Sequence, residues 1–293
     1  MEISYYLVPP VYRPPSEAAS LIFQVTLGCS HNACSFCVSY KGKRFRVKTW
    51  EEIEADIDGA KLYYRNVSRV FLADGNAMTA ETGLLLKTLE KLYREFPRLE
   101  RVGIYARAED FLAKMPEELK QLSEAGITLA YLGLESGDDS LLKSIYKGST
   151  VAENIEGSRR AMEAGIPLSV TVIIGVGGPE RSEEHALATA EAASAINPAY
   201  LSALTMLIPE NSYMDRKIKK GEYKLLTPVQ TLEELKLLIR NMQLTDCVFR
   251  SNHASNYLPL KGVLNQDKDK LLAVIDAALS RPELLRPEFM RAL

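Results

Sequence analysis

Three of the four cysteines in this chain lie within nine positions. The segment CSHNACSFC holds Cys29, Cys34 and Cys37, with four residues between the first two and two residues between the last two. Thiolates are ligands for iron and zinc, and one short loop can bring three of them to a single centre. On a cluster of four irons, three thiolates leave one iron free to bind a small molecule. The segment therefore predicts a metal centre with one open position.

Two other metal sites are compatible with the same cysteines. Plant-type ferredoxins have the four-then-two spacing and a distant fourth cysteine, a place that Cys247 could take in an electron carrier. Zinc accepts mixed sulfur and nitrogen ligands, so His31 could complete a site with the three thiolates. The ferredoxin-type alternative is less favoured because an electron carrier does not need a long α/β pattern. The zinc alternative is less favoured because it does not explain the polar residues at the ends of the later strands. We favour packing for Cys247, because free cysteine is among the most buried residue types.

Short apolar runs rich in β-branched and aromatic residues recur along the chain. They occupy residues 20–27, 69–74, 101–106, 127–135, 168–175 and 199–207. Nearly continuous apolarity over so few residues is typical of strands buried on both faces. The cysteine segment begins where the first run ends.

Longer amphipathic stretches separate these runs and predict helices. They cover residues 49–64, 80–96, 115–126, 153–165, 182–196 and 229–242. Thr49 and Glu52 have the spacing of a capping box, and Gly126 and Gly165 stand where two of the helices would end. Six strand–helix units in a row predict an α/β fold, a partial (β/α)6 TIM-like barrel with a parallel sheet inside and helices outside.

The pattern changes after residue 245. We expect residues 1–245 to form the barrel and residues 246–293 to form a C-terminal extension packed on it, with a helix near residues 267–280. In a parallel barrel the loops that follow the strands gather at one face, where functional groups lie. The cysteine segment follows the first strand and so belongs to that face.

With these features the chain resembles the radical S-adenosylmethionine (SAM) superfamily over residues 20–245, in the branch of the methylthiotransferases and the oxygen-independent coproporphyrinogen oxidases. The usual cysteine spacing of that family is three residues and then two, with an aromatic residue before the last cysteine. Here the spacing is four and then two, and Phe36 takes the aromatic place. The resemblance implies that the three cysteines hold a [4Fe–4S] cluster.

Three later segments resemble the SAM-binding motifs of this family, each at the end of a predicted strand. The segment DGN (74–76) resembles the glycine-rich motif that receives the SAM amino group, ESG (135–137) ends the fourth strand, and Gly175 opens the segment that lies against adenine. Each segment alone is also typical of a tight turn. The residues assigned to SAM by the resemblance are Phe36, Asp74, Gly75, Asn76, Glu135, Ser136, Gly137 and Gly175.

Other polar residues have two interpretations each. Arg107 follows the third strand, where its guanidinium could hold a cofactor carboxylate or make a surface ion pair. His253 and Tyr257, in the polar and aromatic segment 250–262, are candidate catalytic residues or members of a hydrogen-bonded packing loop. The basic run 41–48 is a solvated face or attracts an acidic electron donor or an anionic substrate.

The resemblance also implies a reaction. SAM would bind the open iron, one electron would cleave its sulfonium, and the 5′-deoxyadenosyl radical would abstract a hydrogen atom from an unidentified small-molecule or peptide substrate. A flavodoxin or ferredoxin would supply the electron. The alternative is an electron-transfer or maturation scaffold that binds a cluster without radical chemistry.

Composition is that of an ordinary globular protein. The chain has 293 residues, of which 46% are apolar and 25% charged, and its formal net charge is −2. It can bury a large core, and its charge gives no bias toward nucleic acid or a membrane surface. No apolar run approaches the roughly 18 residues of a membrane span, and the acidic, proline-rich start does not resemble a signal peptide. We expect a cytoplasmic enzyme without a nucleic-acid or membrane partner.

Overall fold

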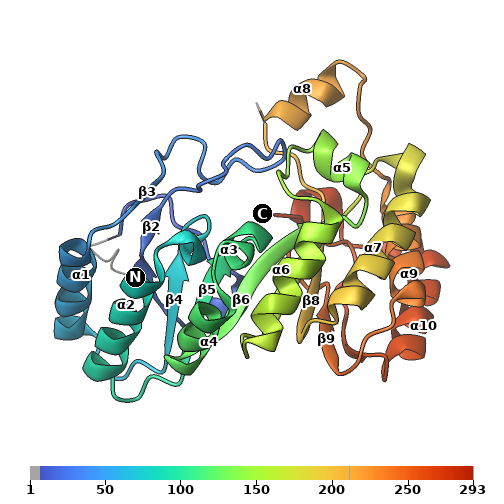
Figure 1. The fold of residues 1–293 in the computed structure, drawn as a ribbon. Helices are drawn as coiled ribbons and strands as arrows, with labels where there is room; N and C mark the ends of the chain where they lie inside the picture. Colours follow the sequence, from blue (N-terminus) through green and yellow to red (C-terminus); the bar gives the residue numbers. More distant parts are fainter. Residues whose placement is uncertain (1–6, 211, 293) are drawn as a thin grey trace. The chain divides into compact units, whose positions relative to one another are not determined.

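Strands and helices alternate along the chain in a computed structural model, which describes residues 7–210 and 212–292 (Figure 1). The chain divides into two units. The first comprises the described residues up to Asn32, Cys37–Leu132 and Glu156–Leu168, and the second comprises Ala33–Phe36, Gly133–Ile155 and the described residues from Ser169 onward. The cysteine segment therefore contributes to both units.

The first unit has a parallel sheet with helices between its strands. Its strands, in their order as neighbours, are β1 (Leu21–Gln24), β4 (Arg69–Ala73), β5 (Arg101–Ala106) and the part of β6 (Ile127–Glu135) up to Leu132. Its helices are α1 (Trp50–Tyr63), α2 (Thr82–Glu95), α3 (Ala108–Leu112), α4 (Pro116–Glu124) and the later part of α6 (Val151–Glu163). Helices α1 and α2 lie side by side (Figure 1).

The local sequence explains these elements. In β4 every residue after Arg69 is buried, as expected for a strand covered on both faces. Helix α1 begins with the predicted capping box, in which Thr49 and Glu52 satisfy each other's backbone amides. In α2 the buried residues Leu85, Leu89 and Leu92 recur at helical spacing and form the face that enters the core.

The second unit continues the same alternation. Its strands are β7 (Leu168–Ile174), β8 (Tyr200–Thr205), β9 (Cys247–Arg250) and β10 (Lys261–Leu264), of which the first three are parallel and the last is antiparallel. Its helices are α5 (Asp139–Ser144), α7 (Ser182–Ile196), α8 (Tyr213–Lys219), α9 (Pro228–Asn241) and α10 (Lys268–Leu279). Helix α9 packs against both α7 and α10 (Figure 1).

The six predicted helices and five of the six predicted strands are confirmed, with small differences at their ends, whereas the predicted strand 20–27 is divided into β1 and a second strand, β2 (Thr26–Leu27). The segment after residue 245 also contains the predicted helix, α10, but it does more than pack on the sheet, because its strand β9 pairs with β8. Short 3-10 helices, η1 to η5, span Pro15–Glu17, Ala77–Thr79, Pro179–Arg181, Pro282–Leu284 and Glu288–Met290. Among the described residues, no helix combines the length and apolarity needed to cross a bilayer.

A two-residue ladder closes the base of the cysteine segment. Strand β2 (Thr26–Leu27) pairs antiparallel with β3 (Arg46–Val47), and the Lys48 amide donates to the Val25 carbonyl. The chain between the two strands, residues 28–45, is called the cysteine loop below. Its two ends are held together by backbone hydrogen bonds in the first unit.

Candidate functional site

A buried carboxylate from the end of β4 holds the start of the cysteine loop. Asp74 is fully buried, and its carboxylate accepts hydrogen bonds from the Gly28 amide at 2.8 Å and the Gln24 side-chain amide at 3.0 Å. The Lys43 ammonium, from the far end of the loop, lies 2.5 Å from the same carboxylate. Asp74 has a φ of 67°, a left-handed conformation that turns its side chain toward the loop it braces. One anion thus ties together both ends of the loop.

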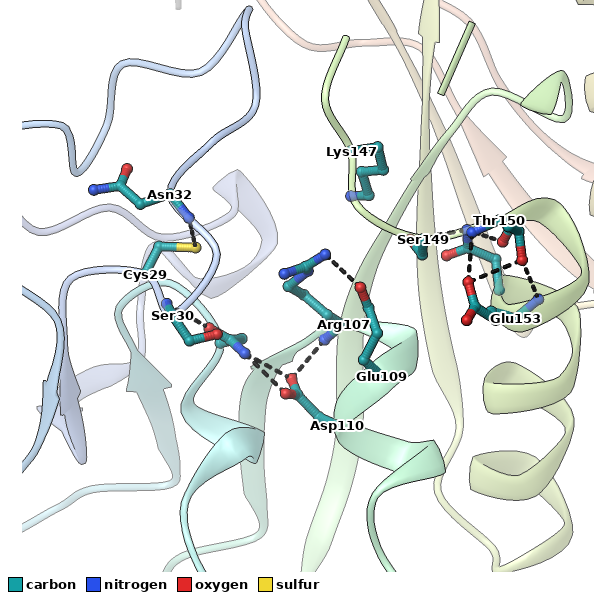
Figure 2. Close-up of polar contacts among 12 residues, drawn as sticks. Cys29, Ser30, Asn32, Arg107, Glu109, Asp110, Lys147, Ser149, Thr150 and Glu153 are labelled. Carbon is teal, nitrogen blue, oxygen red and sulfur yellow. Dashed lines mark hydrogen bonds and ion pairs between the residues drawn. The ribbon is translucent and has the colours of Figure 1, made fainter. Parts of the chain in front are cut away.

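A second brace uses Asn76. Its side-chain oxygen accepts from the Ser30 amide at 3.1 Å, and its nitrogen donates to Asp110 at 2.8 Å and 3.1 Å (Figure 2). Asp110 also accepts from the Arg107 amide at 2.8 Å. Burial raises the pKa of Asp110 to about 6. The chain of contacts connects the cysteine loop with the first turn of α3.

Between these two side chains, Gly75 permits a close approach of two backbone segments. A Cβ atom on Gly75 would lie 2.3 Å from the Cα atom of Cys29 and 2.3 Å from the carbonyl oxygen of Gly28. No side chain fits there without displacement of the loop. The glycine is therefore required by the position of Cys29, whatever ligand binds nearby.

The three predicted ligands are free thiols with partial exposure. Cys29, Cys34 and Cys37 are each of intermediate exposure, and none forms a disulfide. The Asn32 amide donates to the Cys29 sulfur at 3.5 Å (Figure 2).

These residues fit an iron–sulfur cluster by their chemistry. Three thiols on one loop match the donor set of a cluster with an open iron, and the hydroxyl of the buried Tyr40 lacks a hydrogen-bond partner among the described residues. Within residues 7–210 and 212–292 no three Cys, His, Asp or Glu side chains form a preassembled set of metal ligands. The assignment therefore rests on the donor chemistry and on the parts of the loop that Asp74, Gly75 and Asn76 hold in place.

In the second unit, the segment at the end of β6 turns at Glu135, whose φ is 64°. The Glu135 carboxylate accepts from Lys147 at 2.9 Å, and both side chains are largely buried. The Ser136 hydroxyl contacts His185 Nδ1 at 2.9 Å, and the Gly137 amide donates to Thr189 at 2.9 Å. These contacts attach the segment to helix α7.

His185 is neutral at physiological pH because burial lowers its pKa to about 4. Its Nε2 atom lies 3.0 Å from the Ile173 carbonyl, an acceptor, so Nε2 carries the proton. Nδ1 is then the acceptor for the hydroxyls of Ser136 and Thr189. The ring connects the ends of β6 and β7 through α7.

The turn after β7 is held by a carboxylate from α9. Gly175 has a φ of 87°, and its amide donates to Glu234 at 2.6 Å. Ser182 donates to the other carboxylate oxygen at 2.5 Å, and the Tyr223 hydroxyl donates to the Gly175 carbonyl at 2.5 Å. Burial raises the pKa of Glu234 to about 7. Both the amide and the carbonyl of Gly175 are thus engaged.

Phe36 also lies in the second unit. It packs against a cluster of buried apolar residues that includes Ile173, Val176 and Met206. The Ser35 amide beside it donates to the Ile145 carbonyl at 2.9 Å. Phe36 therefore lies at the apolar end of β7, the region that the resemblance assigns to adenine.

Arg107, His253 and Tyr257 have protein partners in the structure. The Arg107 guanidinium pairs with Glu109 at 2.5 Å (Figure 2). His253 contacts the Ser255 hydroxyl at 2.9 Å, and burial and the charge of Arg286 lower its pKa. The assignment of these three residues to cofactor or catalysis stays a prediction.

Tyr257 is held by the C-terminal segment. Its hydroxyl donates to Glu288 at 2.6 Å and accepts from Arg291 at 2.5 Å, and the Arg291 guanidinium lies 4.1 Å from the centre of its ring. Asn256 beside it hydrogen-bonds to Thr205 and Ala203 at the end of β8. These contacts favour the packing-loop interpretation of segment 250–262.

The basic run 41–48 does not form one exposed face, so the interpretation of the whole run as a solvated face is wrong. Lys43 and Lys48 are buried and pair with Asp74 and Asp56 respectively. Lys41 and Arg44 are exposed, whereas Arg46 forms a bidentate pair with Glu52. Both residues of β3, Arg46 and Val47, are exposed, so the two buried lysines lie on either side of that strand.

Cys247 is fully buried on β9, and burial raises the pKa of its thiol to about 12. This is the packing environment that the sequence predicts. Metal ligation requires a thiolate, which such an environment disfavours.

The sequence did not reveal several residues that hold the site: Tyr40, Lys43, Asp110, His185 and Glu234. Asp110 follows Arg107 at capping spacing, a signal that could have identified it. Glu234 lies on a helix among other charged residues, where it is indistinguishable from a solvent-facing side chain.

Comparison with known proteins adds a family. The sequence model of the radical SAM superfamily matches residues 23–193, more than half of the chain. A protein of Methanocaldococcus jannaschii named "Putative methylthiotransferase MJ0865" is 23% identical over 236 residues, which are 72% of this chain and 50% of that protein. This chain thus spans half the length of that relative.

Solved structures show the same fold. Coproporphyrinogen III oxidase of Escherichia coli, described as a radical SAM enzyme, aligns over 75% of this chain and 51% of its own, with 17% identity and a TM-score of 0.59. A radical SAM methyltransferase of Kitasatospora setae, solved with cobalamin and a [4Fe–4S] cluster, aligns over 69% and 39%, with 18% identity and a TM-score of 0.55. The likeness confirms the α/β fold of the partial-barrel type.

Proposed function

The chain belongs to the radical SAM superfamily, and from this premise we propose that it holds a [4Fe–4S] cluster through Cys29, Cys34 and Cys37 and cleaves SAM reductively. When bound, the cluster supplies one electron, SAM yields methionine and a 5′-deoxyadenosyl radical, and that radical takes a hydrogen atom from a small-molecule or peptide substrate. The observation that carries the proposal is the bracing of the cysteine loop by Asp74, Gly75 and Asn76.

The residues of the first unit would position the cluster and the amino-acid end of SAM. The side chains of Asp74 and Asn76 are committed to the loop, so the backbone of this segment is what remains to receive the SAM amino group. Three backbone or side-chain braces on one short loop would limit its movement during the reaction. Such preorganisation is the contribution that a protein makes to cofactor chemistry.

In the second unit, the turn at Gly175 is the segment that the resemblance assigns to adenine. Glu234 and Tyr223 fix the amide and the carbonyl of Gly175, and Phe36 presents an aromatic ring supported by Ile173 and Val176. An apolar, aromatic surface beside a fixed backbone turn suits a purine, which needs stacking and edge recognition. The same apolar residues would exclude water from a radical.

Reductive SAM cleavage tests the proposal. Protein reconstituted anaerobically with iron and sulfide, then given SAM and dithionite, should release methionine and 5′-deoxyadenosine in equal amounts. Cys34→Ala should lose the cluster and both products, because only two local thiolates remain. Cys247→Ala is the matched control and should retain both, since its thiol is buried on β9.

Two outcomes would contradict the proposal. A fully loaded cluster that yields neither product would support the electron-transfer alternative. Loss of the cluster in Cys247→Ala would support the four-cysteine site. Transfer of deuterium from a labelled candidate into 5′-deoxyadenosine would then identify the substrate, and reduction by flavodoxin or ferredoxin, typical donors of the family, would replace dithionite.

A further inference from the structure

Tyr40 has a buried hydroxyl that the described residues do not satisfy. The residue follows Cys37 by three positions in the cysteine loop and is only 7% exposed. Its hydroxyl has no hydrogen-bond partner among residues 7–210 and 212–292. Buried polar groups are nearly always paired, so such a hydroxyl indicates a partner other than the described residues.

Both the backbone and the ring of Tyr40 are held by neighbouring residues. The backbone carbonyl of Tyr40 accepts from the Asn32 side chain at 2.9 Å and from the Lys43 amide at 3.0 Å. The Tyr12 ring packs edge-on at a centroid distance of 5.7 Å, and the Lys43 ammonium lies 5.7 Å from the centre of the Tyr40 ring. The hydroxyl therefore has little freedom to find another partner within the protein.

The surroundings of the hydroxyl contain two of the proposed cluster ligands. Burial, followed by the charges of Asp74, Tyr105, Cys37 and Cys29, raises the pKa of Tyr40. The phenol keeps its proton and is available as a donor. Asp74 already accepts from Gly28 and Gln24 and pairs with Lys43, and the other acceptors of this group include the sulfur atoms of Cys37 and Cys29.

We propose that Tyr40 donates a hydrogen bond to a sulfur atom of the cluster held by the cysteine loop and thereby raises the reduction potential of that cluster. This inference rests on the proposed function. A hydrogen bond to sulfur stabilises the reduced, more negative state more than the oxidised state, and hydrogen bonds to the sulfurs are among the factors that set cluster potentials. Tyr40 is a positioning and tuning residue, without a role in the chemical step.

The test is the midpoint potential of the reconstituted cluster, measured without SAM in Tyr40→Phe. The potential should shift to a more negative value, because the ring is retained and only the donor is lost. Tyr12→Phe removes a hydroxyl from the neighbouring ring, which is 45% exposed, and should leave the potential unchanged. In wild type the Fe–S stretching bands should shift in D2O, and this shift should shrink in Tyr40→Phe.

A second variant covers the case in which Tyr40→Phe does not retain a cluster. Tyr40→3-fluorotyrosine keeps the ring and carries a more acidic, stronger donor, so its potential should move in the positive direction. Equal potentials in wild type and both variants, with SAM cleavage intact, would overturn this inference alone. A shift that appears only with SAM bound would assign the hydroxyl to SAM and would also overturn it. A wild type that never holds a cluster would overturn the proposed function as well.

Discussion

Both units fix a strand-end loop with a buried carboxylate that accepts a glycine amide, but the two carboxylates differ in what surrounds them. In the first unit Asp74 receives the Gly28 amide at 2.8 Å and also pairs with the Lys43 ammonium. In the second unit Glu234 receives the Gly175 amide at 2.6 Å, with the Ser182 hydroxyl on its other oxygen. The imidazole of His185 lies 3.5 Å from Glu234, and burial lowers the pKa of that ring to about 4, so it is neutral.

The comparison indicates that the same hydrogen-bonding arrangement can occur with a cation beside the carboxylate, as at Asp74, or with neutral donors, as at Glu234. Asp74 has a full cation beside it, and this ion pair joins the two ends of the cysteine loop. Glu234 has only neutral donors, so its burial is not offset and its pKa rises to about 7. The Glu234 carboxylate is therefore expected to titrate near physiological pH.

The largest expected effect is a difference in stability between the variants in which each carboxylate is replaced by its amide. Asp74→Asn should lower the free energy of unfolding by about 3–5 kcal/mol, because it leaves the Lys43 ammonium buried without its anion. Glu234→Gln should change it by less than about 1 kcal/mol at pH 7, since the amide oxygen can still accept from Gly175 and no cation is left behind. Urea denaturation of both variants at pH 7 measures the difference.

A double variant provides the control. Asp74→Asn combined with Lys43→Met should recover much of the lost stability, because the second substitution removes the uncompensated charge. Equal losses in Asp74→Asn and Glu234→Gln would refute the electrostatic distinction between the units.

Much of the fold and the outline of the site were predictable from sequence. Repeated β-branched runs identify the buried strands, and local signals such as the Thr49 capping box identify helix starts, because these features depend on neighbouring residues alone. The positions of segments 74–76 and 135–137 after predicted strands are confirmed, whereas their assignment to SAM stays a prediction.

The partners of these residues were not predictable, because they depend on contacts between distant segments. Lys43 stands in a basic run, and only the folded loop shows that its charge faces Asp74 instead of solvent. Similarly, the resemblance assigned Gly75 to SAM binding. In the structure, the absence of a side chain at Gly75 allows the backbone of Cys29 to approach closely. Tertiary contacts gave these residues roles that spacing does not encode.

The next prediction concerns glycine in the two units. Gly75→Ala should cost about 3 kcal/mol and lower the iron content, because its Cβ would lie 2.3 Å from Cys29 Cα and would displace a ligand. Gly137→Ala places a Cβ 2.1 Å from the Ala188 carbonyl oxygen and should cost a similar amount while iron is retained. Iron analysis after reconstitution, together with denaturation, distinguishes the two.

Gly42→Ala is the matched control within the cysteine loop, since a Cβ there meets nothing within 4 Å. It should leave both stability and iron content unchanged. A Gly75 variant that retained full iron and lost only SAM binding would restore the simpler interpretation of this residue as a ligand contact.

The smallest expected effect is a change in the pH dependence of stability. The pKa of Glu234 rises from its ordinary 4.5 to about 7, so between these values the folded state binds more protons than the unfolded state, and stability falls as pH rises. The pKa of His185 falls from 6.5 to about 4, so between about pH 4 and 6.5 the unfolded state binds more protons, and stability rises with pH. The two contributions oppose each other in the wild type.

Single substitutions should therefore separate the two opposing contributions to the pH dependence of stability, which overlap in the wild type. Relative to wild type, Glu234→Gln should gain stability as pH rises from about 4.5 to 7, by on the order of 2 kcal/mol, because a penalty for burying the charge is removed. His185→Gln should show the opposite trend between about pH 4 and 6.5, because the cost of keeping the ring neutral at low pH is removed. Urea denaturation at pH intervals across this range gives both differences. Parallel pH profiles for wild type and Glu234→Gln would show that Glu234 does not titrate in this window and would contradict its raised pKa.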